Sequence, residues 1–366
     1  MTAIGEVPTD PDAIDAQWLT WALQSSGMLT SGSVSDVRVE PLSGSGGFAG
    51  QLRRLHVSYQ GLVDEAPSSI VMKLHSPDES TRALIWRLRA AEREIRFYRE
   101  FAVDAGVPTA LMYFAELHGQ RYVILLEDLA PACAGDLLAE IHPEEIHAAV
   151  ACVAGMHARW WQKKRLRALG WIPSFDELTA IRHEISRDAW PEFIERYAGQ
   201  LPRGFEMVGS SIMDGLDHVR SVLGRVPATV LHGDFRPDNV MFPAVGGGGP
   251  VALIDWQVML YGPAVADVAY YLTSAVPRRV RCQLEAVVLR RYHAALVDEG
   301  VSDYSFGCCF EHYRLAIADL LSRVVVLTTR IQPEAPSRSK TFEVLAERVA
   351  GAVVDLNCAA RLESAP

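Results

Sequence analysis

The segment 232–239 constrains the fold of this 366-residue chain more than any other part of it. Its sequence is His-Gly-Asp-Phe-Arg-Pro-Asp-Asn, so Asp234 and Asn239 lie five positions apart with a proline between them, which favours an irregular loop over a helix. Sixteen residues after Asn239, an apolar strand-like run delivers Asp255. Residues 246–249, all glycine, suit a hairpin loop between two short strands. Such a hairpin would bring Asn239 and Asp255 together.

The three polar residues of this pattern suit phosphoryl transfer. A carboxylate and an amide oxygen are ligands that Mg²⁺ accepts, so Asn239 and Asp255 are predicted metal ligands. Asp234 is then available to orient and deprotonate a hydroxyl group. A lone His-x-Asp beside a strand would be read as turn residues. The full spacing, with the downstream Ile-Asp-Trp, disfavours that reading.

Protein kinases divide the work in the same way, with a catalytic-loop Asp and Asn followed by a metal-binding Asp. Here Gly233 replaces the usual Arg, and Trp256 follows Asp255 where protein kinases have Phe-Gly. With these differences the chain resembles the aminoglycoside phosphotransferase and ecdysteroid-kinase-like (CHK-kinase-like) families of the protein-kinase-like superfamily, over most of residues 40–275. Further residues that carry the resemblance are Leu125 to Leu129, Met156 to Ala158, and Gly262 to Leu272 with Asp267.

The resemblance implies an α+β fold with two lobes. A small β-rich lobe with a leading helix would span residues 1–128 and bind the nucleotide, and a larger, mainly helical lobe would span 129–366. The hydrophobic patterns fit this division. They predict a helix over 12–23, strands over 35–42, 51–59, 69–75, 111–117 and 121–126, one long helix over 79–103, and mostly helices after residue 131 except for a β-rich interval at 229–256.

Glycines in the first lobe are candidate phosphate-binding residues. Gly44, Gly46 and Gly47 lie between two predicted strands, where glycine lets backbone N–H groups approach phosphates. No helix follows them, as a Rossmann motif would need, and no Gly-Lys-Ser/Thr ending marks a P-loop. A flexible hairpin turn is the alternative interpretation.

Lys73 interrupts the apolar strand 69–75, and a buried lysine is costly unless it is paired. The resemblance implies that Lys73 holds the α- and β-phosphates of ATP and pairs with a glutamate of the next helix. Glu94 fits best because it shares a helix face with apolar residues, and Glu92 is the alternative. The resemblance also implies that adenine lies against the hinge from Glu127 to Leu129.

Two histidines are interpreted as structural. His157 with its neighbouring tryptophans favours helix packing over an aromatic substrate platform, and His232 favours bracing of the catalytic loop over a role as base. Residues 170–220 hold nine Asp and Glu against five Arg. This excess could attract an amine-bearing substrate, and a solvated helical face is the other interpretation.

Composition narrows the remaining possibilities. A formal charge of −10 argues against duplex nucleic acid as partner. The N-terminus does not resemble a signal peptide, and no apolar run is long enough for a membrane span, which predicts a cytoplasmic protein. The six cysteines show no zinc-ligand spacing and are expected to be buried free thiols. The oligomeric state stays open.

The predicted function is ATP- and Mg²⁺-dependent transfer of the γ-phosphate to a hydroxyl of a small molecule. The resemblance implies an aminoglycoside-like, macrolide-like or sterol-like alcohol. One alternative is a catalytically silent nucleotide-binding scaffold. A protein kinase is disfavoured because Tyr261-Gly262-Pro263 follows Asp255 within eight residues and leaves no room for a long activation loop.

Overall fold

The computed structural model describes residues 5–42, 50–62, 65–244, 249–331 and 336–362. The chain divides into two compact units. The first contains Met1–Cys133, Ala244–Gly246 and Leu253–Val258, and the second contains Ala134–Pro243, Gly247–Ala252 and Met259–Pro366. Asp255 therefore belongs to the first unit, although it follows the segment 232–239 of the second unit in the chain.

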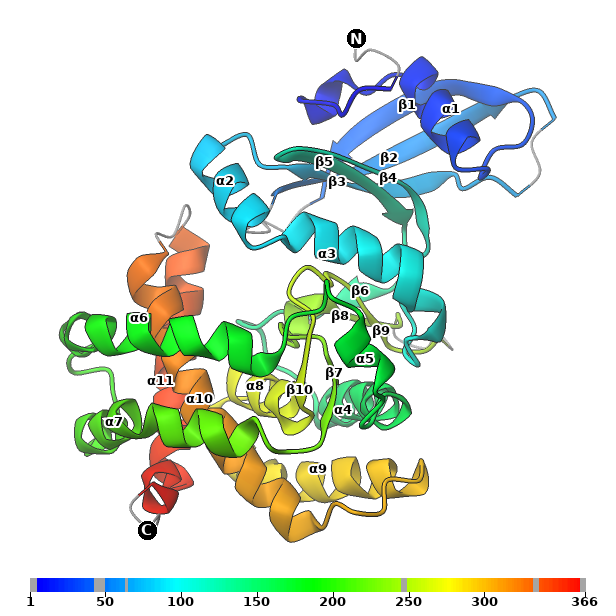
Figure 1. Cartoon of the computed structure of the whole chain (residues 1–366). Coiled ribbons are helices and arrows are strands. Elements are labelled where there is room, and N and C mark those ends of the chain that lie inside the picture. Colours follow the sequence, from blue (N-terminus) through cyan, green and yellow to red (C-terminus); the bar gives the residue numbers. More distant parts are fainter. Residues whose placement is uncertain (1–4, 43–49, 63–64, 245–248, 332–335, 363–366) are drawn as a thin grey trace. The chain divides into compact units, whose positions relative to one another are not determined.

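The first unit is built on a five-stranded antiparallel sheet (Figure 1). The strand order is β1-β2-β3-β5-β4. The strands are β1 (Ser33–Pro41), β2 (Gly50–Gln60), β3 (Ser69–His75), β4 (Met112–His118) and β5 (Arg121–Glu127). The sequence patterns predicted all five strands to within two residues at each end. The mixed α+β fold class is likewise confirmed.

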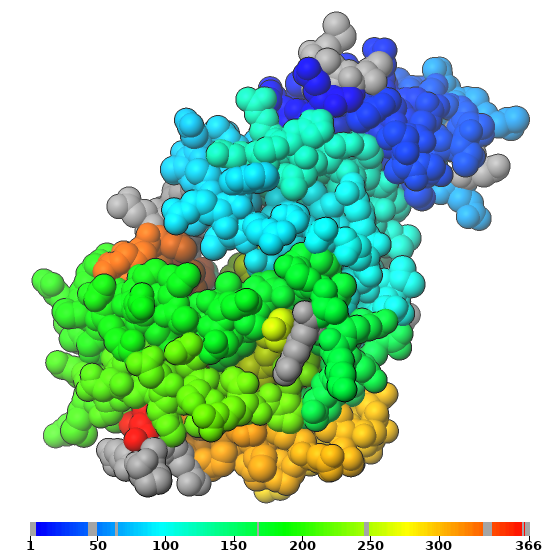
Figure 2. Space-filling view, viewed as in Figure 1, coloured from blue at the N-terminus to red at the C-terminus, as the bar shows by residue number. Residues whose placement is uncertain are grey.

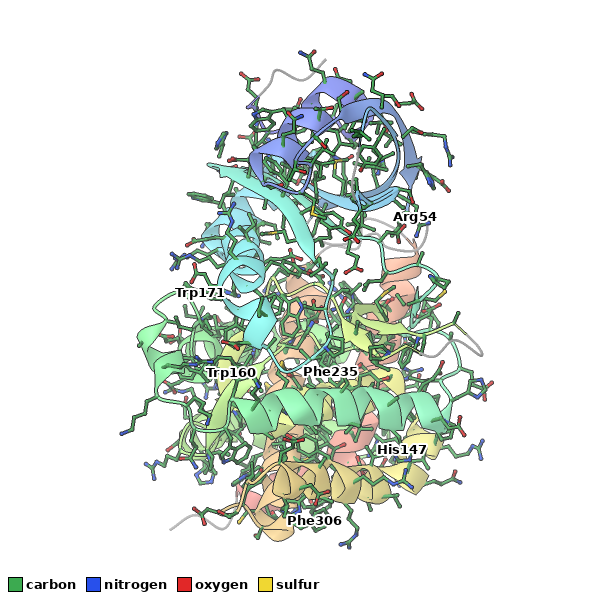
Figure 3. The ribbon with its side chains drawn as sticks, turned by 90° about the vertical axis from the view of Figure 1, so that its right-hand side faces the viewer. Arg54, His147, Trp160, Trp171, Phe235 and Phe306 are labelled. Carbon is green, nitrogen blue, oxygen red and sulfur yellow. The ribbon has the colours of Figure 1, made fainter. Side chains whose placement is uncertain are left out.

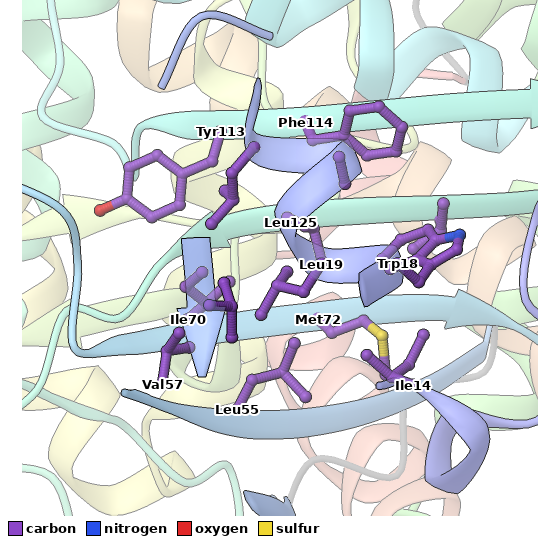
Figure 4. Packing of buried hydrophobic residues seen from close by; sticks show 14 of the residues in the cluster. Ile14, Trp18, Leu19, Leu55, Val57, Ile70, Met72, Tyr113, Phe114 and Leu125 are labelled. Carbon is purple, nitrogen blue, oxygen red and sulfur yellow. The ribbon is translucent and has the colours of Figure 1, made fainter. Parts of the chain in front are cut away.

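Alternation along the strands separates the two faces of this sheet. Met72 and Leu125 point towards α1 (Ala16–Ser25), where they join the apolar core shown in Figure 4. Trp18 and Leu19 of α1 are fully buried in the same core. Lys73, the neighbour of Met72 along β3, must face the opposite side of the sheet. The α1 core therefore fixes the register that directs Lys73 away from α1.

The prediction of one long helix over 79–103 is wrong. α2 (Glu79–Arg87) ends before Arg89, which has a φ of 52° in the left-handed region, and α3 (Ala90–Arg96) begins directly after it. Arg89 forms two hydrogen bonds to Glu92, and these hold the turn. A π-helical turn and a 3₁₀ turn then complete the segment at Phe97–Phe101 and Ala102–Asp104. Neither glycine nor proline marks the break, so the sequence pattern could not reveal it.

The second unit is mainly helical (Figure 1). α10 packs against α6, α7, α8 and α11, and α4 packs against α9. Figure 2 shows α6 and α7, in green, covering one face of this unit. The helices are α4 (Pro143–Arg159), α5 (Arg165–Ala168), α6 (Phe175–Arg196), α7 (Phe205–Leu223), α8 (Val265–Ala275), α9 (Arg278–Asp298), α10 (Phe306–Arg330) and α11 (Pro336–Asp355).

Short strands flank the segment 232–239. β7 (Ala228–Leu231) pairs antiparallel with β10 (Leu260–Pro263), which the sequence patterns did not predict. β8 (Val240–Phe242) lies between β6 (Cys133–Ala134) and β9 (Ala252–Leu253) in a three-stranded sheet. The expected hairpin thus forms as neighbouring strands β8 and β9. The loop 232–239 runs between β7 and β8 and ends in a 3₁₀ turn.

All six cysteines are free, but only part of the predicted burial is found. Cys309 and Cys358 are buried and Cys152 is partly buried, whereas Cys133, Cys282 and Cys308 are exposed. The expectation of buried thiols is wrong for the last three, which lie near the ends of strands and helices. Among the described residues, no helix is both long and apolar enough to cross a membrane.

Candidate functional site

Lys73 lies at the centre of a charged cluster in the first unit. Its ammonium donates a hydrogen bond to Glu94 Oε2 at 2.6 Å and a second to Asp255 Oδ1 at 2.7 Å. Glu94 is on α3, which follows β3 after α2 in the chain. Glu92 binds Arg89 instead, so the structure pairs Lys73 with Glu94.

The cluster is buried, and its charges depend on one another. Lys73 is 8% exposed and Glu94 is 1% exposed. Burial works against the charged ammonium, but the carboxylates of Asp255 and Glu94 hold the pKa of Lys73 well above its ordinary value. Burial, together with the negative charge of Asp255, raises the pKa of Glu94 to about 7 against the lowering effect of Lys73. One lysine thus serves two carboxyl groups, and the cluster favours a further cation.

Asp255 is held by its neighbours in a rare backbone conformation. Its φ is 66°, in the left-handed region that Asp tolerates better than most residues. Trp256, next in the chain, stacks on Phe97 at a ring-centroid distance of 3.9 Å and donates a hydrogen bond from its indole to Thr109. Gln257 donates to Asp255 Oδ2 at 3.1 Å. These contacts fix the direction in which the Asp255 carboxylate points.

The hinge that follows β5 has a polar anchor that the sequence patterns did not predict. Asp128 accepts hydrogen bonds from Arg54 at 2.7 Å and from Ser69 at 2.5 Å; Arg54 is labelled in Figure 3. Burial alone would raise the pKa of Asp128, but these hydrogen bonds lower it. On either side, Glu127 accepts from the Leu111 N–H and the Leu129 carbonyl accepts from a backbone N–H. The placement of adenine at Glu127 and Leu129 stays a prediction.

The candidate glycines Gly44, Gly46 and Gly47 lie outside the described residues. Gly50, at the start of β2, is described. A Cβ there would fall 2.0 Å from the backbone oxygen of Leu74 and 2.8 Å from the hydroxyl of Tyr122. Only glycine therefore fits where the chain enters β2.

Asp234 and Asn239 meet in the second unit. The Asn239 amide group donates through Nδ2 to Asp234 Oδ2 at 3.0 Å and to the Asp234 backbone oxygen at 2.8 Å. Arg236 Nε also donates to Asp234 Oδ2, at 3.3 Å. Because both hydrogen bonds of Asn239 use its nitrogen, its Oδ1 is presented as an acceptor on the other side of the amide group.

The surroundings of Asp234 keep it ionised. Burial alone would raise its pKa, but the positive charges of Arg236 and Arg323, the field of His232 and a hydrogen bond from Tyr270 bring the pKa below its ordinary value. The side chain keeps 15% of its surface exposed. A charged carboxylate that solvent reaches can bind and orient a hydroxyl group.

Asp267 of α8 braces the backbone of the same loop. It accepts hydrogen bonds from the N–H groups of His232 at 2.7 Å and Gly233 at 3.0 Å. It also lies 3.3 Å from His157, whose other ring nitrogen contacts the hydroxyl of Tyr292 at 2.8 Å. His157 and His232 are fully buried, so both have the structural environment that the sequence suggested. Phe235, which follows Asp234 in the same loop, is also buried (Figure 3).

Arg323 of α10 also contacts the loop 232–239, and the sequence patterns did not single out this arginine. It donates to Asp234 Oδ1 at 2.7 Å and to the backbone oxygen of Gly233. Its guanidinium lies over the ring of Tyr270, 4.4 Å from the centroid. Arg323 lies in an apolar stretch of α10, as Lys73 lies in an apolar strand, and that signal could have identified it.

The acidic residues between 170 and 220 have the solvated character of a helical face. Most are exposed, and several form ion pairs with arginines. Examples are Asp176 with Arg220 at 3.0 Å and Asp217 with Arg187 at 2.9 Å.

The oxygen ligands available for a metal are few. The described residues contain no group of three or more His, Cys, Asp or Glu that could hold an ion. Asn239 Oδ1 in the second unit and the Asp255 carboxylate in the first are oxygen donors of the kind that Mg²⁺ accepts. The chemistry of each of these oxygens suits this ion, which keeps most of its positions for water and phosphate.

A family model described as the phosphotransferase enzyme family matches residues 62–304. The chain belongs to this family. The match includes Lys73, Glu94, Asp234, Asn239 and Asp255. Comparison with curated proteins finds no match.

Solved structures of an ethanolamine kinase and of an aminoglycoside phosphotransferase share the fold of this chain. Ethanolamine kinase from Plasmodium vivax is 11% identical with a TM-score of 0.51, over 84% of this chain and 80% of that one. A type IIIa aminoglycoside 2'-phosphotransferase in complex with GDP is 12% identical with a TM-score of 0.51, over 94% and 96% of the two chains. At these identities the likeness concerns the fold alone.

Proposed function

We propose that this phosphotransferase uses ATP and Mg²⁺ to phosphorylate a hydroxyl group of a small molecule. The observation that carries the proposal is the Asp234 carboxylate, which is ionised, reached by solvent and oriented by Asn239. Membership in the phosphotransferase enzyme family supports the reaction class. A cytoplasmic location is part of the proposal.

Each candidate residue has a role in this reaction. The charged Lys73, paired with Glu94, binds the α- and β-phosphates. Asn239 and Asp255 hold Mg²⁺, which offsets the negative charge of the transferred phosphoryl group when bound. Gly44, Gly46 and Gly47 contact the phosphates through backbone N–H groups, and adenine lies near Glu127 and Leu129.

Asp234 orients the acceptor hydroxyl for in-line attack on the γ-phosphorus. The acceptor oxygen forms a bond to phosphorus as the bond to the β-phosphate oxygen breaks and ADP leaves. The hydroxyl proton passes to the carboxylate of Asp234. Positioning and electrostatics, rather than a covalent intermediate, would supply most of the rate.

Two other functions are less well supported. A silent nucleotide-binding scaffold would have no need of Asp234, Asn239, Lys73 and Asp255 together. A protein kinase would need a long segment after Asp255, whereas β10 begins at Leu260. The acceptor is proposed to be an aminoglycoside-like, macrolide-like or sterol-like alcohol. The exposed acidic side chains of α6 and α7 give no particular support to an amine-bearing acceptor.

The test is a mass-spectrometric screen for phosphate added to members of a diverse alcohol library. ATP and GTP are supplied in parallel, each with and without Mg²⁺. We expect Asp234→Ala to abolish the product while ATP binding stays close to that of the wild type. Product formation by Asp234→Ala at the wild-type rate would exclude the role of Asp234. Mg²⁺-dependent ATP binding with no product from any alcohol would favour the silent scaffold.

A further inference from the structure

We infer that Arg323 is a positioning residue, which holds the carboxylate of Asp234 and the backbone of Gly233 in the orientation that phosphoryl transfer needs. The inference rests on the proposed function, because it gives Asp234 the role of orienting the acceptor hydroxyl. It adds to that function a group from α10, 89 positions further along the chain.

The guanidinium of Arg323 binds two consecutive residues at once. One nitrogen donates to Asp234 Oδ1 at 2.7 Å, and the other donates to the carbonyl oxygen of Gly233. The Gly233 N–H is in turn bound by Asp267, and the φ of Gly233 is 81°. The peptide groups on both sides of Gly233 are therefore held, and Asp234 follows directly. A planar fork of N–H donors suits this double contact, and an ammonium group cannot reproduce it.

The two oxygens of Asp234 are held from different directions. Oδ1 accepts from Arg323, and Oδ2 accepts from Asn239 and Arg236. Contacts to both oxygens fix the plane of the carboxylate as well as its position. Tyr270 also donates a hydrogen bond to this carboxylate. Removing Arg323 would leave the contacts with Asn239, Arg236 and Tyr270 and would release Oδ1 from the guanidinium, so that the group is less firmly held in one plane. The lone pair that meets the acceptor hydroxyl would then lose its fixed direction.

Arg323 is itself positioned by the ring of Tyr270 and by the packing of its helix. Its guanidinium lies 4.4 Å over the ring of Tyr270, and its side chain is 24% exposed. One turn earlier on α10, Asp319 accepts from Arg182 at 2.5 Å and contacts His183 at 2.8 Å, both on α6. These contacts fix the part of α10 from which Arg323 extends.

The kinetic test compares variants of Arg323 in the full chain with the acceptor found in the screen. We expect Arg323→Ala to lower kcat roughly 100-fold, as misplacement of a reacting group does, with the KM for ATP within about twofold of the wild type. Added methylguanidinium should restore part of the rate to Arg323→Ala. Arg323→Lys keeps the charge but not the fork, so we expect an intermediate kcat. It also shows that the fold tolerates a change there.

Arg330→Ala is the matched control. Arg330 is on the same helix and forms an ion pair with Glu192 at 2.5 Å, but it does not contact the loop 232–239. It should keep the wild-type kcat and show no response to methylguanidinium. A purely structural role for Arg323 would lower the amount of folded protein without changing kcat per folded molecule. That result would overturn the inference.

A crystal structure of Arg323→Ala tests the inference without any turnover. We expect the Asp234 carboxylate to rotate or to lose a single orientation, with Asn239 still bound. An unchanged carboxylate would overturn the inference, whatever the kinetics. If the wild type phosphorylates no alcohol, the proposed function fails, and this structural comparison still decides whether Arg323 orients Asp234.

Discussion

At the scale of single residues, Lys73 is a buried charge on which two carboxylates depend. It is buried, and it is the shared hydrogen-bond donor of Glu94 and Asp255. Breaking a buried ion pair by removing one partner costs far more than the pair itself contributes, because a buried charge loses its compensation. Removing the lysine is therefore expected to destabilise the first unit.

Lys73→Met should lower the free energy of unfolding by about 3 kcal/mol and abolish detectable ATP binding. Urea denaturation and calorimetric titration measure the two effects. The double variant Lys73→Met/Glu94→Gln should recover part of the stability, because Gln carries no charge that needs a partner. A double variant no more stable than Lys73→Met would show that the loss does not come from the stranded carboxylate of Glu94.

The sequence singled out Lys73, Asp234 and Asn239 as candidates because each carries a local signal. Lys73 interrupts an apolar strand. Asp234 and Asn239 belong to the eight-residue motif 232–239, which resembles that of a known family. Arg323 also interrupts an apolar stretch, but its partner Asp234 is 89 positions away, so the local pattern could not show what Arg323 binds. The helix face already favoured Glu94 over Glu92, and the structure pairs Lys73 with Glu94 while Glu92 binds Arg89.

At the scale of elements, α8 and α10 support the loop 232–239. Asp267, near the start of α8, accepts hydrogen bonds from two backbone N–H groups of the loop. Arg323 of α10 donates a hydrogen bond to Asp234. The strands were predictable because alternation with a period of two is a strong local signal. The break between α2 and α3 was not, since it occurs at Arg89, a residue type that seldom adopts a positive φ.

Asp267→Ala should lower the free energy of unfolding by about 2–4 kcal/mol, because the N–H groups of His232 and Gly233 would be left without an acceptor. Hydrogen exchange should then be faster at these two amides than in the wild type. Asp176→Ala, which removes an exposed ion pair with Arg220, is the control and should change stability by less than about 1 kcal/mol. Unchanged exchange at His232 and Gly233 would argue against this bracing role.

The link between α6 and α10 predicts a pH dependence of stability. Burial alone would raise the pKa of Asp319, but the charge of Arg182 and the hydrogen bond with His183 bring it below its ordinary value. A lowered pKa in the folded state means that this carboxylate stabilises the fold above its unfolded pKa. The contribution is lost as the pH falls through that value towards the lower folded pKa.

Asp319→Asn should therefore be less stable than the wild type by about 1–3 kcal/mol at pH 7. The difference should shrink as the pH falls below about 4, where the unfolded carboxyl group takes up a proton. Urea denaturation of both proteins across this pH range measures the difference. A gap that stays constant down to the lowest pH would contradict the assignment of Asp319 as an ionised partner of Arg182 and His183.

At the scale of the whole molecule, the candidate residues are divided between the two units. Lys73, Glu94 and Asp255 belong to the first, and Asp234 and Asn239 belong to the second. The separation in sequence hides this division, because residues 253–258 belong to the unit formed mainly by the first 133 residues. The expected boundary at residues 128 and 129 was a single cut in the chain, and a single cut cannot describe this exchange.

Binding of ATP with Mg²⁺ should stabilise the whole chain. At a ligand concentration 100 times the Kd, the expected gain is about 2.7 kcal/mol, seen as a higher Tm in a thermal scan. EDTA should remove the metal-dependent part of the gain, and so should Asp255→Ala. We expect ATP to stabilise Asp255→Ala equally with and without Mg²⁺. In the wild type, Mg²⁺ should increase the stabilisation. A full metal effect in Asp255→Ala would exclude that residue as a ligand.

The ring stack between Trp256 and Phe97 has a consequence for inhibitor discovery. The rings are 10° from parallel at 3.9 Å, Trp256 is fully buried, and its indole is hydrogen-bonded to Thr109. A compound that needs the segment after Asp255 to swing outward must first break this stack and expose the indole, at a cost of about 3 kcal/mol or more. Compounds that accept the segment where it lies avoid that penalty. Chemical libraries directed at this protein should therefore be weighted towards compounds that leave Trp256 in place.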